Sequence, residues 1–222
     1  MLVVPSAVAG ATAPPNGDDP ELAELLLTGA DLPPGWQPFD VPFTVDPIDP
    51  NADPDDPCLR FWHAFDAGLA SPHATAGFMS GQYRFITETV FRLESPAATS
   101  ELVQTLIADL AACPGVTGID GNVTTFAPLP FPAFGDVSAA YRGEMSVMGM
   151  TFVTLISAAA IDDLVITVSI SDPTADEQLF ERLTMIASDR AAASTADAAP
   201  PGGGATTSDE SGGKPDLILP PT

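Results

Sequence analysis

The clearest β-forming stretch of the chain reads AAYRGEMSVMGMTFVTLISAAAIDDLVITVSIS, residues 139–171. Polar and apolar side chains alternate over 139–147, which places Tyr141 and Arg142 on opposite faces of a strand. Residues 151–157 are apolar on both faces, as is typical of a central strand. Residues 164–171 alternate again, and turns at 148–149 and 161–163 separate the three segments. The stretch therefore predicts a three-stranded antiparallel meander.

Helix signals flank this meander. On the N-terminal side, Ser95 and Pro96 supply a capping residue and a proline at the first helical position. An apolar stripe then runs from Leu102 to Leu110, and the sequence Cys113-Pro114-Gly115 ends the helix. On the C-terminal side, Asp172 and Pro173 repeat the same start signal. They predict a last helix that ends near Arg190.

Further elements precede these. Asp19 and Pro20 predict a short first helix of about nine residues that stops at Gly29. Trp36 is expected to fold back over the leucines of that helix. Gly81 divides a predicted hairpin into residues 77–80 and 82–93. The segment 58–70 is compatible with either a short helix or an irregular strand.

The predicted element order is α-ββ-α-βββ-α. Helices separated by antiparallel strands indicate an α+β domain in which the helices pack on one face of the sheet. The other face would meet solvent or line a groove. Residues 1–17 are expected to form a flexible leader or the remnant of a signal peptide, residues 18–191 a single domain, and residues 192–222 a disordered tail rich in Ala, Gly, Pro and Ser.

The charge balance narrows the functional classes. Thirty acidic residues face seven basic ones, giving a formal net charge of −23. Such a surface repels phosphate backbones and anionic lipids, so nucleic-acid binding is not expected. No segment approaches the ~20 apolar residues of a membrane span. Asp53, Asp55 and Asp56 could ligate calcium, but they lack EF-hand spacing, and a solvated acidic loop is the favoured interpretation. No metal or cofactor is predicted.

Two cysteines, Cys58 and Cys113, leave three states open: buried thiols, a redox pair or one disulfide. Which of these states forms depends on whether the protein resides in a reducing or an oxidising compartment. An apolar stretch at residues 2–8 followed by A-x-A sequences favours export, although a positively charged region is missing and a plain leader is the alternative. An exported, cell-envelope location is the prediction.

No catalytic motif is recognisable. The G-x-S-x-G sequence of serine hydrolases is absent. Only His63 and His73 could act as a histidine base, and the carboxylate pairs lie in proline-rich loops that would hold them poorly. An enzyme is therefore not expected, and a hydrolase is the weaker alternative.

The candidate binding residues are the charged and aromatic side chains of the predicted sheet and of the segment before it. Arg84, Glu88 and Arg92 share one face of a predicted strand, and Arg142 lies beside Glu144 on another. Trp62 and Tyr141 could stack on a ligand. The alternative is structural: cross-strand charge pairs and core aromatics.

Residues 25–36, LLLTGADLPPGW, resemble the opening signature of the PknH-like extracellular sensor domains of actinobacteria. The similarity continues with a cysteine about twenty residues later, a strand before Ser95, a helix ending in Cys113 and a late meander with a closing helix. It covers roughly residues 20–190.

The resemblance implies an antiparallel sheet backed by helices, with a cleft for an unknown ligand. It also implies that Cys58 and Cys113 pair in a secreted or lipoprotein-like member, and the members of this group can hold a second cysteine pair that is absent here. No kinase motif is present, so phosphorylation is not carried over. The expected function is an exported sensor-like or ligand-binding domain, expected to be a monomer, whose partner is a small ligand or an envelope protein. An interaction module without a small ligand is the alternative.

Overall fold

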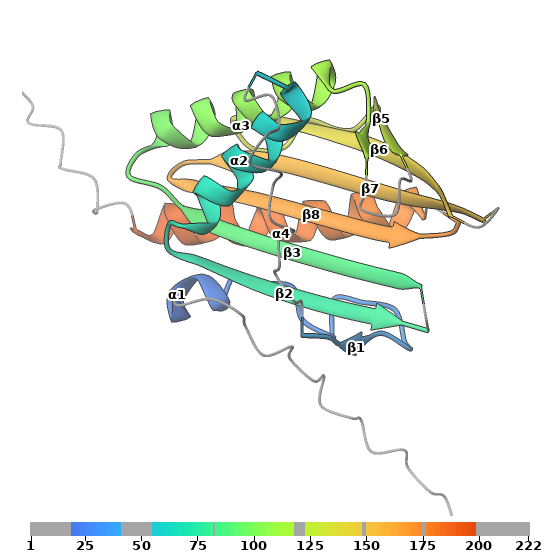
Figure 1. Ribbon diagram of the computed structural model, residues 1–222. Helices are drawn as coiled ribbons and strands as arrows, with labels where there is room; N and C mark the ends of the chain where they lie inside the picture. Colours follow the sequence, from blue (N-terminus) through green and yellow to red (C-terminus); the bar gives the residue numbers. More distant parts are fainter. Residues whose placement is uncertain are drawn as a thin grey trace, which may run out of the picture.

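The computed structural model describes residues 19–40, 55–81, 83–117, 123–147, 150–174 and 176–198; of residues 62, 66, 67, 116, 117, 147, 150, 197 and 198 only the backbone is described. One antiparallel sheet of eight strands forms the centre of the molecule, and helices cover it on both sides (Figure 1). The α+β class and the antiparallel sheet predicted from the sequence are confirmed.

The helices are α1 (Pro20–Ala23), α2 (Pro57–Leu69), α3 (Pro96–Ala112) and α4 (Glu177–Ala198). The strands are β1 (Gln37–Pro38), β2 (His73–Ser80), β3 (Arg84–Arg92), β4 (Val116–Thr117), β5 (Val123–Pro128), β6 (Val137–Val147), β7 (Met150–Ile161) and β8 (Leu164–Asp172). Across the sheet the strands follow the order β1-β2-β3-β8-β7-β6-β5-β4.

The predicted meander is confirmed as β6, β7 and β8, which pair antiparallel in sequence. The turn between β7 and β8 contains Asp162, whose φ of 54° lies in the left-handed region that a short aspartate side chain tolerates. The predicted hairpin is also confirmed as β2 and β3, with β2 beginning earlier, at His73. Because β3 pairs with β8, the hairpin and the meander join into one continuous sheet.

The expectation that all helices lie on one face of the sheet is wrong. The even-numbered residues of β8, such as Ile166, pack with Leu183 of α4, whereas Val165 packs with Val103 of α3. Figure 1 shows α2 and α3 on one side of the strands and α4 on the other. We name these sides the α2–α3 face and the α4 face. The central strands are apolar on both sides, so each side must be covered.

Helix boundaries differ from the prediction at both ends of the chain. Asp19 caps α1 as expected, but α1 is only four residues long, and the chain leaves it through a turn at Glu24 and Leu25, so Leu26 and Leu27 are not helical. The segment that was left open between helix and strand is helix α2. Ser95 caps α3, and Cys113 ends it, as predicted.

The last helix begins later and ends later than predicted. Asp172 closes strand β8 instead of capping a helix, and the backbone N–H of Leu179 donates to the Asp176 carboxylate (2.9 Å), which caps α4. Buried Ala187 and Ala191 extend the packed face of α4, and alanine is the best helix former. The helix therefore runs to Ala198. Residues 192–198, which were predicted as the start of the tail, are the last residues of α4.

Three short strands were not predicted: β1, β4 and β5. Proline lies in β1 and at the end of β5, and β1 and β4 have two residues each. Proline is confined to edges and strand ends because it cannot donate a hydrogen bond to the ladder. Among the described helices, none combines the length and the apolar character that crossing a bilayer requires.

Candidate functional site

The α4 face is closed by the segment 22–36, the region that holds the quoted LLLTGADLPPGW sequence. Leu22, Leu26 and Leu27 are buried against Ile86 of β3 and the apolar side of α4. Trp36 is half-buried against the same cluster, as predicted from its position after the leucines. The leucines of this segment therefore complete the core on this side of the sheet.

Glu88 lies beneath this segment and is 1% exposed. Its Oε2 accepts a hydrogen bond from the backbone N–H of Leu27, while Oε1 has no hydrogen-bond partner. Burial disfavours the ionised form and raises the pKa of Glu88 to about 8, against the opposing influences of the Leu27 N–H and the Arg190 charge. Glu88 therefore acts as a buried, largely neutral acceptor that fixes the backbone of the segment.

Arg190 of α4 holds the same segment from the other side. It donates to the carbonyl oxygen of Leu26 and to both carboxylate oxygens of Asp31, at 3.1 and 3.2 Å. Burial opposes ionisation of Asp31, but hydrogen bonds from Thr28 and Arg190 outweigh it and lower the pKa of this carboxyl. The backbone of the segment is thus held by one hydrogen bond to Glu88 of the sheet and one from Arg190 of α4, which also binds Asp31.

The two arginines of β3 are engaged at opposite ends of the strand. Arg84 pairs with the buried carboxylate of Asp172 (2.6 Å) and lies over the ring of Trp36, 5.1 Å from its centroid. Arg92 pairs with Glu21 (3.2 Å) and lies near Asp163 (3.6 Å). Both link the sheet to neighbouring segments of the chain.

The remaining candidate residues lie elsewhere. Arg142 contacts Glu144 (2.8 Å) and Glu177 at the start of α4 (3.2 Å). Tyr141 points to the α2–α3 face, where it is 6% exposed. The side chain of Trp62 is outside the described residues. The predicted binding residues are therefore not brought together as one site, and the charged ones lie on the α4 face.

A small apolar cavity lies between the α2–α3 pair and strands β6 to β8. Its volume is about 20 Å³, and Phe61, Leu106 and Tyr141 line it. The Tyr141 hydroxyl donates to the carbonyl oxygen of Ile107 (3.0 Å), and burial raises the pKa of Tyr141. About one water molecule fills such a volume, so the cavity is a packing void and not a ligand site.

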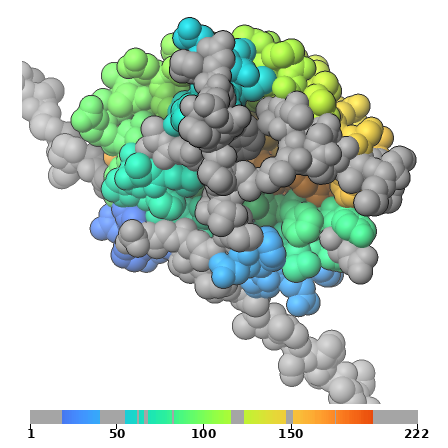
Figure 2. Space-filling view, viewed as in Figure 1, coloured from blue at the N-terminus to red at the C-terminus, as the bar shows by residue number. Residues whose placement is uncertain are grey.

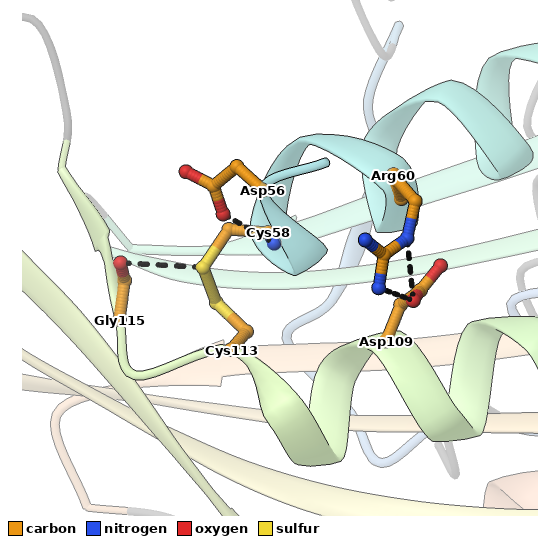
Figure 3. Close-up of a disulfide and its surroundings, with 6 residues drawn as sticks. All are labelled: Asp56, Cys58, Arg60, Asp109, Cys113 and Gly115. Atoms are coloured by element: carbon orange, nitrogen blue, oxygen red, sulfur yellow. Dashed lines mark hydrogen bonds and ion pairs between the residues drawn. A yellow bond between two sulfur atoms is a disulfide. The ribbon is translucent and has the colours of Figure 1, made fainter. Parts of the chain in front are cut away.

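A disulfide fastens the two helices of the α2–α3 face. Cys58 at the start of α2 and Cys113 at the end of α3 are bonded, with their Cα atoms 4.8 Å apart (Figure 3). Beside the disulfide, Arg60 contacts the mostly buried Asp109 (2.7 Å). The Cys58 sulfur also lies 3.4 Å from the carbonyl oxygen of Gly115, a contact without a proton because a disulfide has no S–H. The structure thus contains the pairing that the resemblance implies.

Three rows of hydroxyl groups cross the α2–α3 face of the sheet. In the first row Thr75, Thr89 and Thr167 lie side by side on β2, β3 and β8, and Thr75 Oγ1 donates to Thr89 Oγ1 (3.1 Å). In the second row Thr87 and Ser169 are hydrogen-bonded (2.7 Å). In the third row Ser171 and Thr154 are hydrogen-bonded (3.0 Å). We name these seven residues the hydroxyl rows.

The first row is buried, whereas both pairs of the second and third rows are half-buried. A bond between two hydroxyls uses one donor and one acceptor position, and each hydroxyl has one donor and two acceptors. Each half-buried pair therefore keeps one donor and up to three acceptor positions for another molecule.

Two aromatic pairs lie next to the hydroxyl rows. Phe85, which is in register with Ser171, contacts Phe39 with a centroid distance of 5.6 Å. Phe152, two positions before Thr154, makes an edge-on contact with Tyr83 at 5.8 Å. Tyr83 is 51% exposed, which is high for an aromatic side chain. Figure 2 views the molecule from the side of α2 and α3.

Charge is distributed very unevenly between the two faces. Within the described strands, every arginine, aspartate and glutamate belongs to the α4 face, as the pairing registers show. The titratable side chains that these strands place on the α2–α3 face are the buried Tyr141 of β6 and His73, at the start of β2. The hydroxyl rows therefore form an uncharged polar surface on a protein with a net charge of −23.

The sequence already contained the signal for this surface. The alternation in residues 84–92 and 164–171 placed threonines and serines on one face of each strand. The residues predicted to bind are charged and aromatic side chains, which lie on the other face of the sheet or in the core. What the sequence did not show is that β3 and β8 are neighbours, which brings their hydroxyls together.

The described residues offer little for acid–base or metal chemistry at this face. No group of three or more His, Cys, Asp or Glu side chains within these residues converges in a way that would hold a metal ion. A serine nucleophile needs a base within hydrogen-bond reach, whereas Ser169 and Ser171 are hydrogen-bonded to the hydroxyls of Thr87 and Thr154. The chemistry that the hydroxyl rows can perform is hydrogen bonding.

Comparison with known proteins adds distant structural similarities. No protein-family model matches the sequence, and no curated protein matches it. The extracellular domain of PknH from Mycobacterium tuberculosis is similar at 14% identity with a TM-score of 0.40, over 56% of this chain and 64% of that one. The match thus spans less than two thirds of that domain. LpqN, described as involved in cell envelope biogenesis of Mycobacterium tuberculosis, is similar at 12% identity with a TM-score of 0.27, over 82% of this chain and 87% of that one.

Proposed function

We propose that this chain is an exported, non-enzymatic binding domain of the cell envelope, of the PknH-like extracellular sensor type, and that it binds its ligand or partner on the α2–α3 face. The uncharged surface made by the hydroxyl rows carries the proposal. It offers hydrogen-bond donors and acceptors such as Thr87 and Ser169 beside exposed aromatic area, which suits recognition.

The same surface supports binding in preference to catalysis. General acid–base catalysis needs a titratable group within hydrogen-bond reach of the reacting atoms. On the described strands this face carries two titratable side chains, Tyr141 and His73, and the hydroxyl of the buried Tyr141 is bonded to the carbonyl oxygen of Ile107. His73 lies at the end of β2, where its Nδ1 is 3.0 Å from the carbonyl oxygen of Ser71. Its ring is also near Phe91, with centroids 6.5 Å apart, so it is positioned by local contacts rather than by a nucleophile.

The disulfide supports the extracytoplasmic location. Structural disulfides persist in oxidising compartments and are rare in the cytosol. The Cys58–Cys113 bond joins two helices that cover one face of the sheet, so it belongs to the fold and not to an exposed redox pair: both cysteines are 6% exposed.

Native mass spectrometry of the protein purified from its own host's culture medium and envelope fraction tests this function. We expect the protein outside the cytosol, with a mass lower by two hydrogens than that of the reduced chain, and with a retained ligand or partner. Protein confined to the cytosol with free thiols would contradict the proposal. A catalytic turnover dependent on His73 would contradict its non-enzymatic part.

A further inference from the structure

The chemistry of the hydroxyl rows indicates which class of molecule this face would take. We infer that the α2–α3 face binds a neutral carbohydrate, whose hydroxyls replace water on Thr87, Ser169, Ser171 and Thr154 and whose ring packs on the adjoining aromatic pairs. This inference rests on the proposed function, because it specifies the ligand class of the same face.

The spacing of the rows suits an extended sugar chain. Successive rows on one strand are two residues apart, about 7 Å, and neighbouring strands are about 4.8 Å apart. Thr87 and Ser169 lie one row away from Ser171 and Thr154, so the two half-buried pairs form a grid of four hydroxyls over β3, β8 and β7. A multi-hydroxyl ligand can contact several points of that grid at once.

The absence of charge favours a neutral ligand over an anionic or a cationic one. An anion would lack a cationic partner on this part of the described surface, and the net charge of −23 would repel it. A cation would find no carboxylate here, since Glu88, Glu144 and Asp172 belong to the α4 face. A hydroxyl grid loses little when it exchanges water for the hydroxyls of a neutral sugar.

The aromatic pairs supply the apolar part of the contact. Sugar rings present C–H groups on their faces, and these pack against aromatic side chains. Tyr83 is 51% exposed and is held edge-on by Phe152, while Phe85 lies in the third row beside Phe39. Phe85 lies in the row that contains Ser171 and Thr154, and Phe152 lies one row further along β7.

The test is an amide-shift titration of the full-length protein with maltohexaose, cellohexaose and a mannohexaose, beside a uronic-acid oligosaccharide of similar length. We expect at least one neutral hexasaccharide to shift the amides of Thr87, Ser169 and Ser171, and the anionic one to leave them unchanged. The double variant Thr87→Val with Thr154→Val should weaken that binding about tenfold, since two hydrogen bonds of roughly 0.5–1.5 kcal/mol each would be lost.

The matched control is Thr125→Val, which removes a threonine hydroxyl from β5 on the α4 face. It should leave the affinity unchanged, and the melting temperatures of all variants verify that they fold. Failure of every neutral hexasaccharide to bind, equal binding by the double variant, or shifts confined to the α4 face would each overturn the inference. A non-carbohydrate ligand retained in the native mass spectrum would overturn this inference while leaving the proposed function in place.

Discussion

The two faces of the sheet hold their covering layers by different means. On the α2–α3 face, a covalent bond between Cys58 and Cys113 fastens two helices over apolar side chains and rows of neutral hydroxyls. On the α4 face, the covering segment 22–36 is held by a buried carboxyl, Glu88, and by the guanidinium of Arg190. The first layer depends on redox conditions and the second on protonation. The strength of each layer can therefore be altered without touching the other.

The largest expected effect comes from the disulfide. Replacing Cys58 and Cys113 together by serine should lower the free energy of unfolding by about 4 kcal/mol, because the cross-link closes a loop of 55 residues in the unfolded chain. The melting temperature should fall by roughly 10 °C. Differential scanning calorimetry measures this, and reducing agent should have no further effect on the variant. Hydrogen exchange should rise first in α2 and α3; an equal rise in α4 would mean that the layers are not independent.

The next effect is a pH dependence centred on Glu88. Its pKa is about 8 in the folded protein and 4.5 as an ordinary glutamate, so between these values the folded state keeps a proton that the unfolded state has released. Stability from this group is therefore complete below pH 4.5 and is lost as the pH rises through 8. The total loss is on the order of a few kcal/mol.

Urea unfolding of the wild type and of Glu88→Gln across pH 5–9 isolates this contribution, because the two proteins have all their other ionisable groups in common. Glutamine keeps an acceptor for the Leu27 N–H and cannot ionise. We expect the wild type to lose stability relative to the variant as the pH rises. Parallel curves would show that the α4-face layer does not depend on protonation of Glu88.

A smaller effect is expected from the one buried hydroxyl that ties β6 to α3. Tyr141→Phe removes the hydrogen bond to the Ile107 carbonyl oxygen and should cost about 1 kcal/mol. Urea unfolding at neutral pH measures it. If the loss were much larger, the small cavity beside Tyr141 would have to collapse or fill with water when the hydroxyl is removed.

The smallest effect concerns the exposed ion pairs of the α4 face. Arg142→Gln removes the contacts with Glu144 and Glu177, each of which is more than half exposed at its carboxylate. Solvent and salt screen such pairs, so the expected change in unfolding free energy is a few tenths of a kcal/mol. Thermal or urea unfolding measures this change. A loss above about 1 kcal/mol would mean that these exposed charge pairs help to hold α4 on the sheet, in addition to Glu88 and Arg190.

Local signals in the sequence predicted much of the fold. Alternation identified β6 and β8, and an apolar run between them identified β7. Ser95 with Pro96 fixed the start of α3, because a helix cap, like a strand period, is encoded by neighbouring residues. The start of α4 was misplaced because Asp172 fits a cap in sequence yet is drawn into β8 by its pairing with Val153. Tertiary pairing of this kind is not visible in a local pattern.

The candidate site was harder to predict for the same reason. Glu88 was predicted as a candidate binding residue, but its burial under Leu27 depends on a segment 61 positions away. Arg84 and Arg92 were expected on an open face, and the second helical layer covers that face. The hydroxyl rows form only because β3 pairs with β8, a neighbour relation between strands far apart in sequence.

The contact between Arg190 and Leu26 spans 164 positions of the chain. During synthesis the segment 22–36 therefore emerges long before α4, the element that completes its surroundings. Until α4 is made, its leucines lack the α4 side of their packing, and exposed leucines in an incomplete domain favour aggregation. The order of translation thus makes closure of the α4 face a late event, and it gives export in an unfolded form an advantage, because folding can then start with both ends of the domain already synthesised.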